Sequence, residues 1–373
     1  MWKRFANMLD LLKKQDWVLS AAIAVLSAAS LVILYSINVE FFWRQLIWLI
    51  ISFVVIFGFV AVEWRSLLTY RWLITVIYLA AVFLLVITLI AAPTIRSAQS
   101  WIVIGSIRIQ TSEFAKVALI LLLSYFFARG HIGIGHWRIL AKSFVYFVIP
   151  AILILLQPDL GTTLILSAIW ISFLLVSGIR WRHIAIGLGV TAVVTIIAWN
   201  YFLQDYHKER IKGLFNPEYD PLGINYGVIQ SKIAIGSAGF WGKGFQQGTQ
   251  VQLGFLPEAQ SDFIFSAFVE EWGIFGGLVI LAAFSSLLFR LIKIGLSADN
   301  NLLRLLSLGT VMVMLAHFIF NIGSGLGLLP VVGVPFPFLS YGGSNILANA
   351  FLIGIIQSLV ARSTFLKEHE LYA

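Results

Sequence analysis

Residues 72–91, WLITVIYLAAVFLLVITLIA, decide which kind of fold this chain adopts. The segment holds twenty consecutive residues without a single charge. As an α-helix rising about 1.5 Å per residue, it is long enough to cross the ~30 Å hydrocarbon core of a lipid bilayer. The segment therefore predicts a transmembrane helix.

The same pattern recurs along the chain and predicts an all-α, polytopic membrane protein with about ten transmembrane helices. The expected spans lie near residues 16–36, 45–62, 72–91, 114–128, 143–158, 160–177, 184–203, 264–289, 305–325 and 344–361. Composition agrees, because 60% of the residues are hydrophobic, 11% are charged and the mean hydropathy is +0.94, which exceeds the apolar content of a soluble core. A transmembrane β-barrel is excluded, since its strands would be ~10 residues of alternating polarity.

The charges report topology. The net charge of +8 would suggest a nucleic-acid partner in a soluble domain, but the Lys and Arg residues lie mainly in short connections between spans, so we expect no nucleic acid. With the N-terminus inside, the opposite short loops hold only Arg44, Arg96 and Arg108. The positive-inside rule then predicts that both termini are cytoplasmic. The absence of cysteine excludes disulfides and thiolate chemistry.

We expect a single membrane domain over residues 1–373, with one long external loop at about 204–263. That loop is polar and rich in glycine, and connections of such length are usually functional. The last external connection, between Gly325 and Gly343, holds three prolines among apolar residues. A non-helical segment at membrane depth must pack in protein or line a cavity, so we expect a re-entrant or groove-lining loop.

Ionisable residues inside the spans are the first candidates for function, because each costs roughly 2.5 to 3.5 kcal/mol to insert. Glu113 and Lys116 open the fourth span at i, i+3 spacing, so they can pair with each other. The pair is either a structural ion pair or part of an external, substrate-binding cavity. His317, deep in the ninth span, is expected to make a helix–helix hydrogen bond rather than to relay protons.

Three carboxylates lie at predicted helix starts or just beyond them. Asp159 follows Pro158 and can cap the next helix or contact substrate. Asp262 ends the long external loop, and Glu270 lies eight residues later, about 12 Å along the helix and about 80° around it. Asp262 and Glu270 could therefore share one groove as base and support, or as ligands of a divalent cation such as Mg²⁺ or Mn²⁺.

The external loop also carries cations that suit a phosphate. Residues 236–244, GSAGFWGKG, lack the spacing and the Ser or Thr of a Walker A loop, but their glycines permit close backbone approach to a ligand. Lys243 and Lys232 are candidate phosphate contacts. A further external basic cluster is formed by Lys208, Arg210 and Lys212. The alternative is a tight surface turn with a solvated charged face.

Ten motifs in order resemble one family. They are 110–116 (QTSEFAK), 157–162 (QPDLGT), 220–223 (DPLG), 230–237 (QSKIAIGS), 242–244 (GKG), 248–250 (GTQ), 255–258 (FLPE), 262–265 (DFIF), 330–335 (PVVGVP) and 340–344 (SYGGS). Together they are similar to the SEDS proteins (shape, elongation, division and sporulation) over almost the whole chain. The 248–250 and 220–223 motifs favour the RodA branch, which serves cell elongation.

The resemblance implies a peptidoglycan glycosyltransferase that polymerises lipid II at the outer face of the bacterial cytoplasmic membrane. It further implies a class B penicillin-binding protein as the partner that crosslinks the glycan, with membrane lipid around both. Asp262 matches the aspartate that the family links to catalysis. Gln260 and Ser261 stand where the family usually has His-Thr, so no role for that histidine carries over.

The expected reaction is an inverting glycosyl transfer, with the acceptor 4-hydroxyl attacking the anomeric carbon of a lipid-linked pyrophosphate donor. Asp262 is the candidate base, and Lys116, Lys243, Lys232 and Arg210 are candidates for the pyrophosphate. Whether a metal assists is left open. The alternative function is a lipid-linked precursor flippase, which would need polar groups at mid-membrane and on both faces. The rare charges cluster on the external side, which favours the enzyme.

Overall fold

The computed structural model describes residues 10–93, 99–105, 107–130, 137–178, 205–216 and 219–371. Its long helices are α2 (Trp17–Ile37), α3 (Val39–Phe59), α5 (Arg71–Ala91), α6 (Thr111–Gly130), α7 (Trp137–Leu156), α8 (Leu160–Val176), α13 (Ile264–Leu296), α14 (Asn301–Gly325) and α15 (Gly343–Leu371). Eight of these are long and apolar enough to cross a membrane, and α8 is a shorter apolar helix. Each of these helices matches a predicted span. The predicted span at 184–203 lies outside the described residues.

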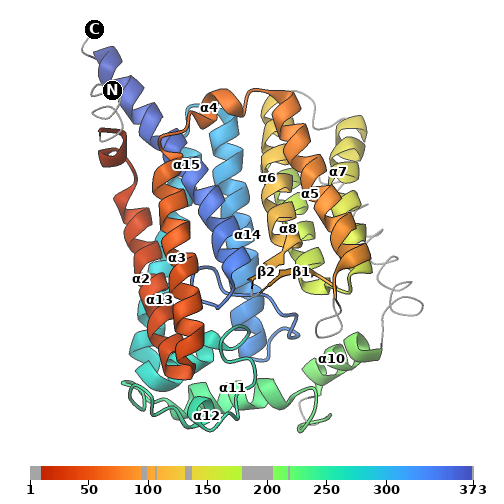
Figure 1. Ribbon diagram of the computed structural model, residues 1–373, viewed down its shortest axis with the longest axis vertical. Coiled ribbons are helices and arrows are strands. Elements are labelled where there is room, and N and C mark those ends of the chain that lie inside the picture. Colours follow the sequence, from red (N-terminus) through yellow and green to blue (C-terminus); the bar gives the residue numbers. More distant parts are fainter. Residues whose placement is uncertain are drawn as a thin grey trace.

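The helices form an upright bundle with two distinct ends (Figure 1). The start of α2, the short helix α4 (Trp64–Leu67) and the last turns of α15 lie at one end, which we call the terminal end. The opposite end, the loop end, carries α10 (Asp205–Phe215), α11 (Tyr226–Ser237) and α12 (Thr249–Gln252). The loop predicted at 204–263 therefore contains three short helices joined by turns and irregular segments.

Burial places α6 and α15 at the centre of the bundle. In the spanning window, 78% of α6 and 83% of α15 are buried, against 22% of α3 and 28% of α5. The outer helices turn Trp72, Phe83 and Val54 outward, where a lipid tail replaces protein as the neighbour. Polar side chains on α6 and α15 are thus held away from lipid.

A two-stranded hairpin precedes α6 and is the one feature among the described elements that an all-α prediction lacks. Strand β1 (Trp101–Ile104) pairs antiparallel with β2 (Ile107–Gln110), in the register Trp101 opposite Gln110. The amide of Gln110 donates to the hydroxyl of Ser344 at 3.0 Å, which ties the hairpin to the start of α15.

Residues 326–342, which we call the central loop, connect α14 to α15 without helical structure. Phe336, Phe338 and Leu339 are fully buried in it. Gln45 of α3 donates to the carbonyl of Ser340 at 3.1 Å, and the hydroxyl of Ser340 accepts from the amide of Phe336 at 2.8 Å. The prediction of a non-helical segment packed inside protein is confirmed.

Helix α13 is broken near its first third. Gly273 has φ 71° and ψ −176°, a left-handed conformation that interrupts the helical hydrogen bonds. Residues 239–244 replace them: the amides of Lys243 and Gly244 donate to the carbonyls of Glu270 and Glu271, both at 3.0 Å, and the amides of Ile274 and Phe275 donate to the carbonyls of Gly239 and Phe240, both at 3.1 Å. The glycine-rich segment is thereby built into the helix itself.

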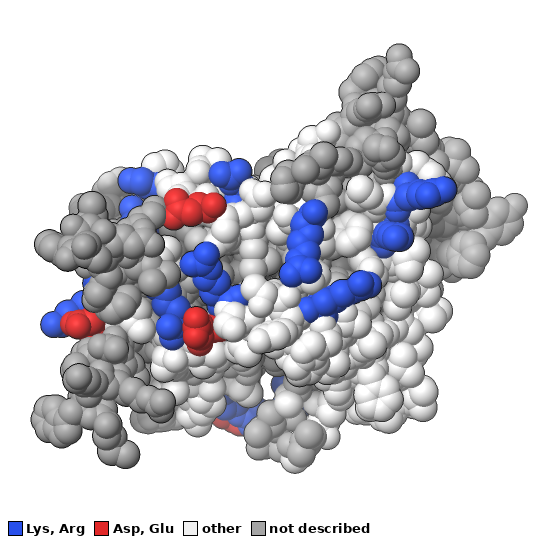
Figure 2. Space-filling model, turned by 90° about the horizontal axis from the view of Figure 1, so that it is seen from above, with Lys and Arg blue, Asp and Glu red and all other residues white. Residues whose placement is uncertain are grey.

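The terminal end is strongly cationic (Figure 2). The described Lys and Arg residues on this side are Lys13, Lys14, Arg65, Arg71, Arg129, Arg138, Lys142, Arg290, Lys293, Arg304 and Arg362.

The contacts of Asp16, which we call the clasp, join the first and last long helices at the terminal end. Asp16 caps α2 and forms a salt bridge with Arg290 of α13. Gln357 of α15 accepts a hydrogen bond from the backbone amide of Asp16 at 2.9 Å and donates one to the backbone carbonyl of Asp16 at 3.0 Å.

Candidate active site

Asp262 lies at the loop end where the 257–263 turn leads into α13, and it is half-buried. Its amide donates to the carbonyl of Glu258 at 3.1 Å, and its own carbonyl accepts from Asn321 of α14 at 3.2 Å. Ser340 of the central loop donates to the carbonyl of Ser261 at 2.7 Å. The backbone around Asp262 is therefore fixed from three directions, while its carboxylate remains partly open to solvent.

Arg210 of α10 reaches the same place. Its guanidinium donates to the carbonyl of Val331 in the central loop. Burial lowers the pKa of Arg210, and the charge of Asp262 partly offsets this by raising it. The structure thus brings together Arg210 and Asp262, two residues that lie 52 positions apart in the predicted external loop.

Glu113 and Lys116 form a salt bridge of 2.8 Å in which each side chain is 3% exposed. The pairing predicted from their spacing is confirmed. Lys116 also contacts Nε2 of His317 on α14 at 2.8 Å, and Asn345 of α15 donates to the second oxygen of Glu113 at 3.0 Å. His317 makes the helix–helix contact expected of it. The pair therefore joins three helices at the centre of the bundle.

Asp159 caps α8 through its side chain, which accepts from the amide of Thr162 at 3.0 Å and from the Thr162 hydroxyl at 2.8 Å. Gln110 of the hairpin donates to it at 3.2 Å. Burial raises the pKa of Asp159 above its ordinary value, although the Thr162 hydrogen bonds oppose this. The charges of Lys116 and Glu113 also act on Asp159, which places the cap beside the buried ion pair.

Glu270 and Lys243 occupy a different place from the one predicted for them. The Glu270 side chain has no exposed surface, and one of its oxygens pairs with Lys243 at 2.7 Å. The amides of Gln250 and Val251 donate to the same carboxylate at 2.9 and 3.2 Å. Glu270 is therefore the carboxylate around which residues 242–251 fold, and it does not stand free in a groove with Asp262.

Lys232 of α11 is exposed and rests against the central loop. A Cβ at Gly327 would lie 2.5 Å from its ammonium, which shows how closely the lysine approaches that glycine. Of the remaining basic cluster, Lys208 is half-buried and Lys212 is exposed on α10. Lys232 and Arg210 thus both contact the first part of the central loop, at Gly327 and Val331 respectively.

Several residues of the site were missed by sequence reasoning. Asn321, Ser340 and Asn345 hold the Asp262 junction and the ion pair through contacts between distant segments. Gly161 was also missed as a packing residue, because a Cβ there would lie 2.3 Å from the carbonyl of Val332. Asn321 did carry a signal: it lies four residues after His317 and so shares a helix face with it.

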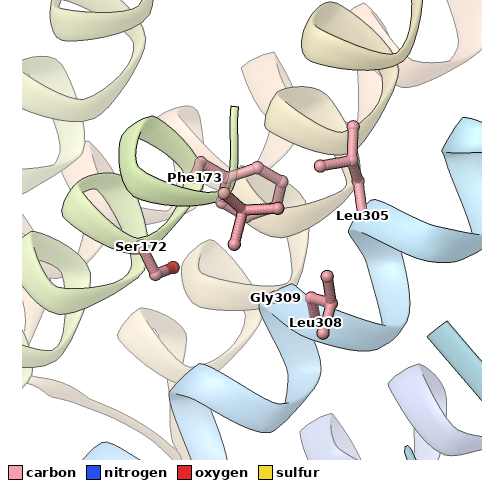
Figure 3. Close-up of a pocket in the computed structure, with 6 residues that line it drawn as sticks. Ser172, Phe173, Leu305, Leu308 and Gly309 are labelled. Carbon is pink, nitrogen blue, oxygen red and sulfur yellow. The ribbon is translucent and has the colours of Figure 1, made fainter. Parts of the chain in front are cut away.

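Two pockets in the described part of the chain lie away from this site. A small pocket between α8 and α14 is lined by Phe173, Leu305 and Gly309 (Figure 3), and its one hydroxyl, Ser172, donates to the carbonyl of Ile169. A cavity of about 280 Å³ lies at the terminal end between Arg290, Lys293 and Ser363. The candidate site is instead an open, polar junction at the loop end.

Comparison with known proteins identifies the family of the chain. Residues 11–364 match the family of FtsW, RodA and SpoVE, described as cell cycle proteins. The peptidoglycan glycosyltransferase MrdB of Escherichia coli K12 is 38% identical over 283 residues, which cover 76% of each chain. Stage V sporulation protein E of Bacillus subtilis is 34% identical over 350 residues, covering 92% of this chain and 93% of that protein.

Two solved structures share the fold over most of their length. A chain of a peptidoglycan synthase complex that coordinates polymerization and crosslinking matches with a TM-score of 0.81 and 30% identity, covering 94% of this chain and 98% of that one. The rod shape determining protein RodA of Thermus thermophilus matches with a TM-score of 0.69 and 27% identity, covering 94% and 97%.

Proposed function

Because this chain belongs to the SEDS family of FtsW, RodA and SpoVE proteins, we propose that it polymerises lipid II into glycan strands during cell elongation. It is a multi-pass membrane protein and a peptidoglycan glycosyltransferase like the relatives it matches. The observation that carries the proposal is the junction of Asp262, Arg210 and the central loop at the loop end of the bundle, where half-buried Asp262 and Arg210 interact through their charges.

The proposed reaction joins two lipid-linked sugars. The 4-hydroxyl of the acceptor attacks the anomeric carbon of the donor, its proton passes to the Asp262 carboxylate, and the bond to the pyrophosphate breaks with inversion. The electron pair of that bond leaves with the polyprenyl pyrophosphate, so positive charge must face it. Arg210, Lys232 and Lys116 are the proposed contacts for this charge.

We assign Lys243 and Glu270 to a different task. Lys243 pairs with Glu270 and also donates to Thr249 at 2.7 Å, and the amides of Gln250 and Val251 donate to the same Glu270 carboxylate. Both residues therefore shape the 242–251 segment next to the site rather than bind substrate. Asp159 likewise serves as the cap that positions α8 against the central loop.

A divalent cation remains a proposal. The described residues contain no group of three or more His, Asp or Glu side chains that could hold a metal alone. Mg²⁺, however, usually takes one or two carboxylates together with substrate phosphates and water. Asp262 and the donor pyrophosphate fit that requirement for Mg²⁺ or Mn²⁺, which would supply further charge to the leaving group.

The orientation follows from the two ends of the bundle. The cationic terminal end is proposed to face the cytoplasm, which places both termini inside and the loop end at the outer face of the cytoplasmic membrane. A class B penicillin-binding protein is the proposed partner, because a structural relative belongs to a synthase complex that couples polymerization to crosslinking.

The test is polymerisation of lipid II by the purified full-length chain with a penicillin-binding protein that lacks transferase activity of its own. Glycan product from the wild-type complex supports the enzyme. Removal of the Asp262 charge in Asp262→Asn is expected to lower turnover by roughly 10² to 10⁴ while the unfolding temperature stays unchanged. Transport of lipid II between leaflets without polymer would support the flippase, and normal turnover in folded Asp262→Asn would remove the base assignment.

A further inference from the structure

Two polar residues of α14 face the central loop from one side. His317 and Asn321 are four residues apart, so both project from the same face of the helix. His317 is 2% exposed and Asn321 is also 2% exposed. Their contacts run in opposite directions, since His317 reaches the buried ion pair and Asn321 reaches the backbone of Asp262.

The chemistry of Lys116 decides the tautomer of His317. Lys116 is paired with a carboxylate and is therefore an ammonium, which can donate hydrogen bonds but not accept them. Nε2 of His317, 2.8 Å away, must accept from it. The ring proton consequently lies on Nδ1, which donates to the carbonyl of Pro335 at 2.9 Å. His317 is thus a neutral ring with a fixed donor and a fixed acceptor.

Asn321 continues the connection on the other side of the loop. Its amide nitrogen is 2.9 Å from the carbonyl of Val334, 3.2 Å from that of Asp262 and 3.3 Å from that of Ser261. The central loop also binds directly to the turn that holds Asp262, because the amide of Tyr341 donates to the carbonyl of Gln260 at 2.9 Å. An uninterrupted path of hydrogen bonds and covalent bonds then leads from Lys116 to Asp262.

We propose that His317 is a positioning residue for the transferase reaction, and that it sets the place of Asp262 relative to Lys116 by holding the carbonyl of Pro335. The inference rests on the proposed function. The base comes from the turn before α13 and the cation for the leaving group from α6, and transfer needs both within a fraction of an ångström of their productive places. His317 contacts Lys116 directly and reaches Asp262 through the central loop.

Two conservative substitutions remove the two hydrogen bonds of the His317 ring one at a time. In His317→Asn, the amide nitrogen is as many bonds from Cα as Nδ1, so it can still donate to Pro335 and only the acceptor for Lys116 is lost. In His317→Gln, the amide oxygen extends towards the position of Nε2, so it can accept from Lys116 while the bond to Pro335 is lost. His317→Leu removes both hydrogen bonds while the side-chain volume stays similar.

The experiment measures kcat and KM for lipid II polymerisation by the full-length complex, with unfolding temperatures for every variant. We expect His317→Leu to lose about 100-fold in kcat, since a shift of about 1 Å at a reacting group can cost that much. His317→Asn should recover kcat to within a few fold of wild type, His317→Gln should not, and KM should change little in either. Thr310→Val is the matched control and should keep the wild-type kcat. The buried hydroxyl of Thr310 donates to the carbonyl of Leu306 in the same helix, α14, at 2.8 Å.

A purely structural role of His317 predicts a higher kcat for His317→Gln than for His317→Asn, because glutamine fills the space of histidine better than asparagine does. Equal or higher kcat in His317→Gln than in His317→Asn would overturn the proposal, as would wild-type kcat in a folded His317→Leu. If His317→Leu does not fold, the comparison of the Asn and Gln variants alone decides. Absence of polymer from the wild-type complex would instead contradict the proposed function, so the two failures are distinguishable.

Discussion

The ion pair of Glu113 and Lys116 is nearly closed to water, and this decides how it responds to mutation. Lys116→Met or Glu113→Gln alone leaves one buried charge without its partner, which typically costs about 3 to 5 kcal/mol. We expect the double variant to cost less than the sum of the two single variants, since neither charge remains. Unfolding temperatures of the four proteins in one membrane mimetic form the double-mutant cycle.

The exposed pair of Arg44 and Glu40 provides the control, because its side chains are 46% and 63% exposed and water compensates either charge. Glu40→Gln should leave the unfolding temperature nearly unchanged. Activity separates the two roles of Lys116. A stable Lys116→Met, Glu113→Gln double variant is expected to remain inactive, and full turnover in it would show that the pair is structural.

Asp159 gives the protein a pH dependence whose sign follows from its burial. Its pKa is raised in the folded state, so the stability associated with the protonated carboxyl is complete below the ordinary Asp value of about 3.9 and is lost as pH rises through the folded pKa. Asp159→Asn keeps a capping side chain without the charge. The unfolding temperature of Asp159→Asn should therefore rise relative to wild type as the pH is increased from about 4 towards neutral.

The measurement is a series of unfolding temperatures over pH, with the exposed Asp10→Asn as the matched variant. Asp10→Asn should follow the wild-type curve throughout. A difference between Asp159→Asn and wild type that stays constant over pH would contradict the raised pKa.

Residues of the site could be predicted where their partners are close in sequence. Glu113 and Lys116 are three positions apart, so helix geometry alone brings them together. Asn345 reaches Glu113 across 232 positions and Asn321 reaches Asp262 across 59, and no local pattern encodes such contacts. The same reason explains Glu270: Asp262 lies in the turn before α13, and the Glu270 carboxylate is bound by a glycine-rich segment that precedes it in the chain.

At the scale of elements, the break in α13 depends on Gly273 in the helix and Gly242 in the segment that packs against it, since the two backbones are in contact. Gly242 has φ 84°, and a Cβ there would lie 2.1 Å from the carbonyl oxygen of Glu271. Gly239 has φ 66° but open space around its Cα. The left-handed backbone costs alanine roughly 1 to 2 kcal/mol at either site. Gly242→Ala must add a collision with backbone, which typically costs about 1 to 3 kcal/mol more.

We therefore expect Gly242→Ala to lower the unfolding temperature clearly more than Gly239→Ala. Thermal unfolding of both variants beside wild type measures the difference. Equal shifts would mean that the interlock of residues 239–244 with α13 does not hold as described.

Elements differ in how well the sequence predicts them. Spans such as α5 follow from an unbroken apolar run, because a helix pairs its backbone groups within one segment and so needs no other strand inside the bilayer. The hairpin before α6 could not be predicted, since two strands of four residues carry too little periodicity. The break at Gly273 also escaped, because a single glycine in an apolar helix has no signature until the segment that pairs with it is known.

For the whole molecule, the cationic terminal end and the site at the loop end should face opposite compartments. The natural chain has no cysteine, so single cysteines report topology without background. Ser66 is an exposed residue of α4 at the terminal end, and Gln247 is exposed at the loop end, so Ser66→Cys and Gln247→Cys report on the two ends. A membrane-impermeant maleimide applied to intact spheroplasts should label Gln247→Cys, and it should label Ser66→Cys only after permeabilisation. The reverse pattern would invert the proposed orientation.

The clasp at Asp16 has a consequence for biogenesis. Gln357 bonds to a residue made 341 positions earlier, so at a synthesis rate of roughly 5 to 20 residues per second the first helix waits some tens of seconds for its last partner. Until then, the backbone at Asp16 lacks the contacts that bury it in the finished protein. A nascent chain that stops short of α15 thus lacks these contacts at its terminal end. In the proposed orientation that end faces the cytoplasm, where a protease can distinguish the incomplete chain from a finished one.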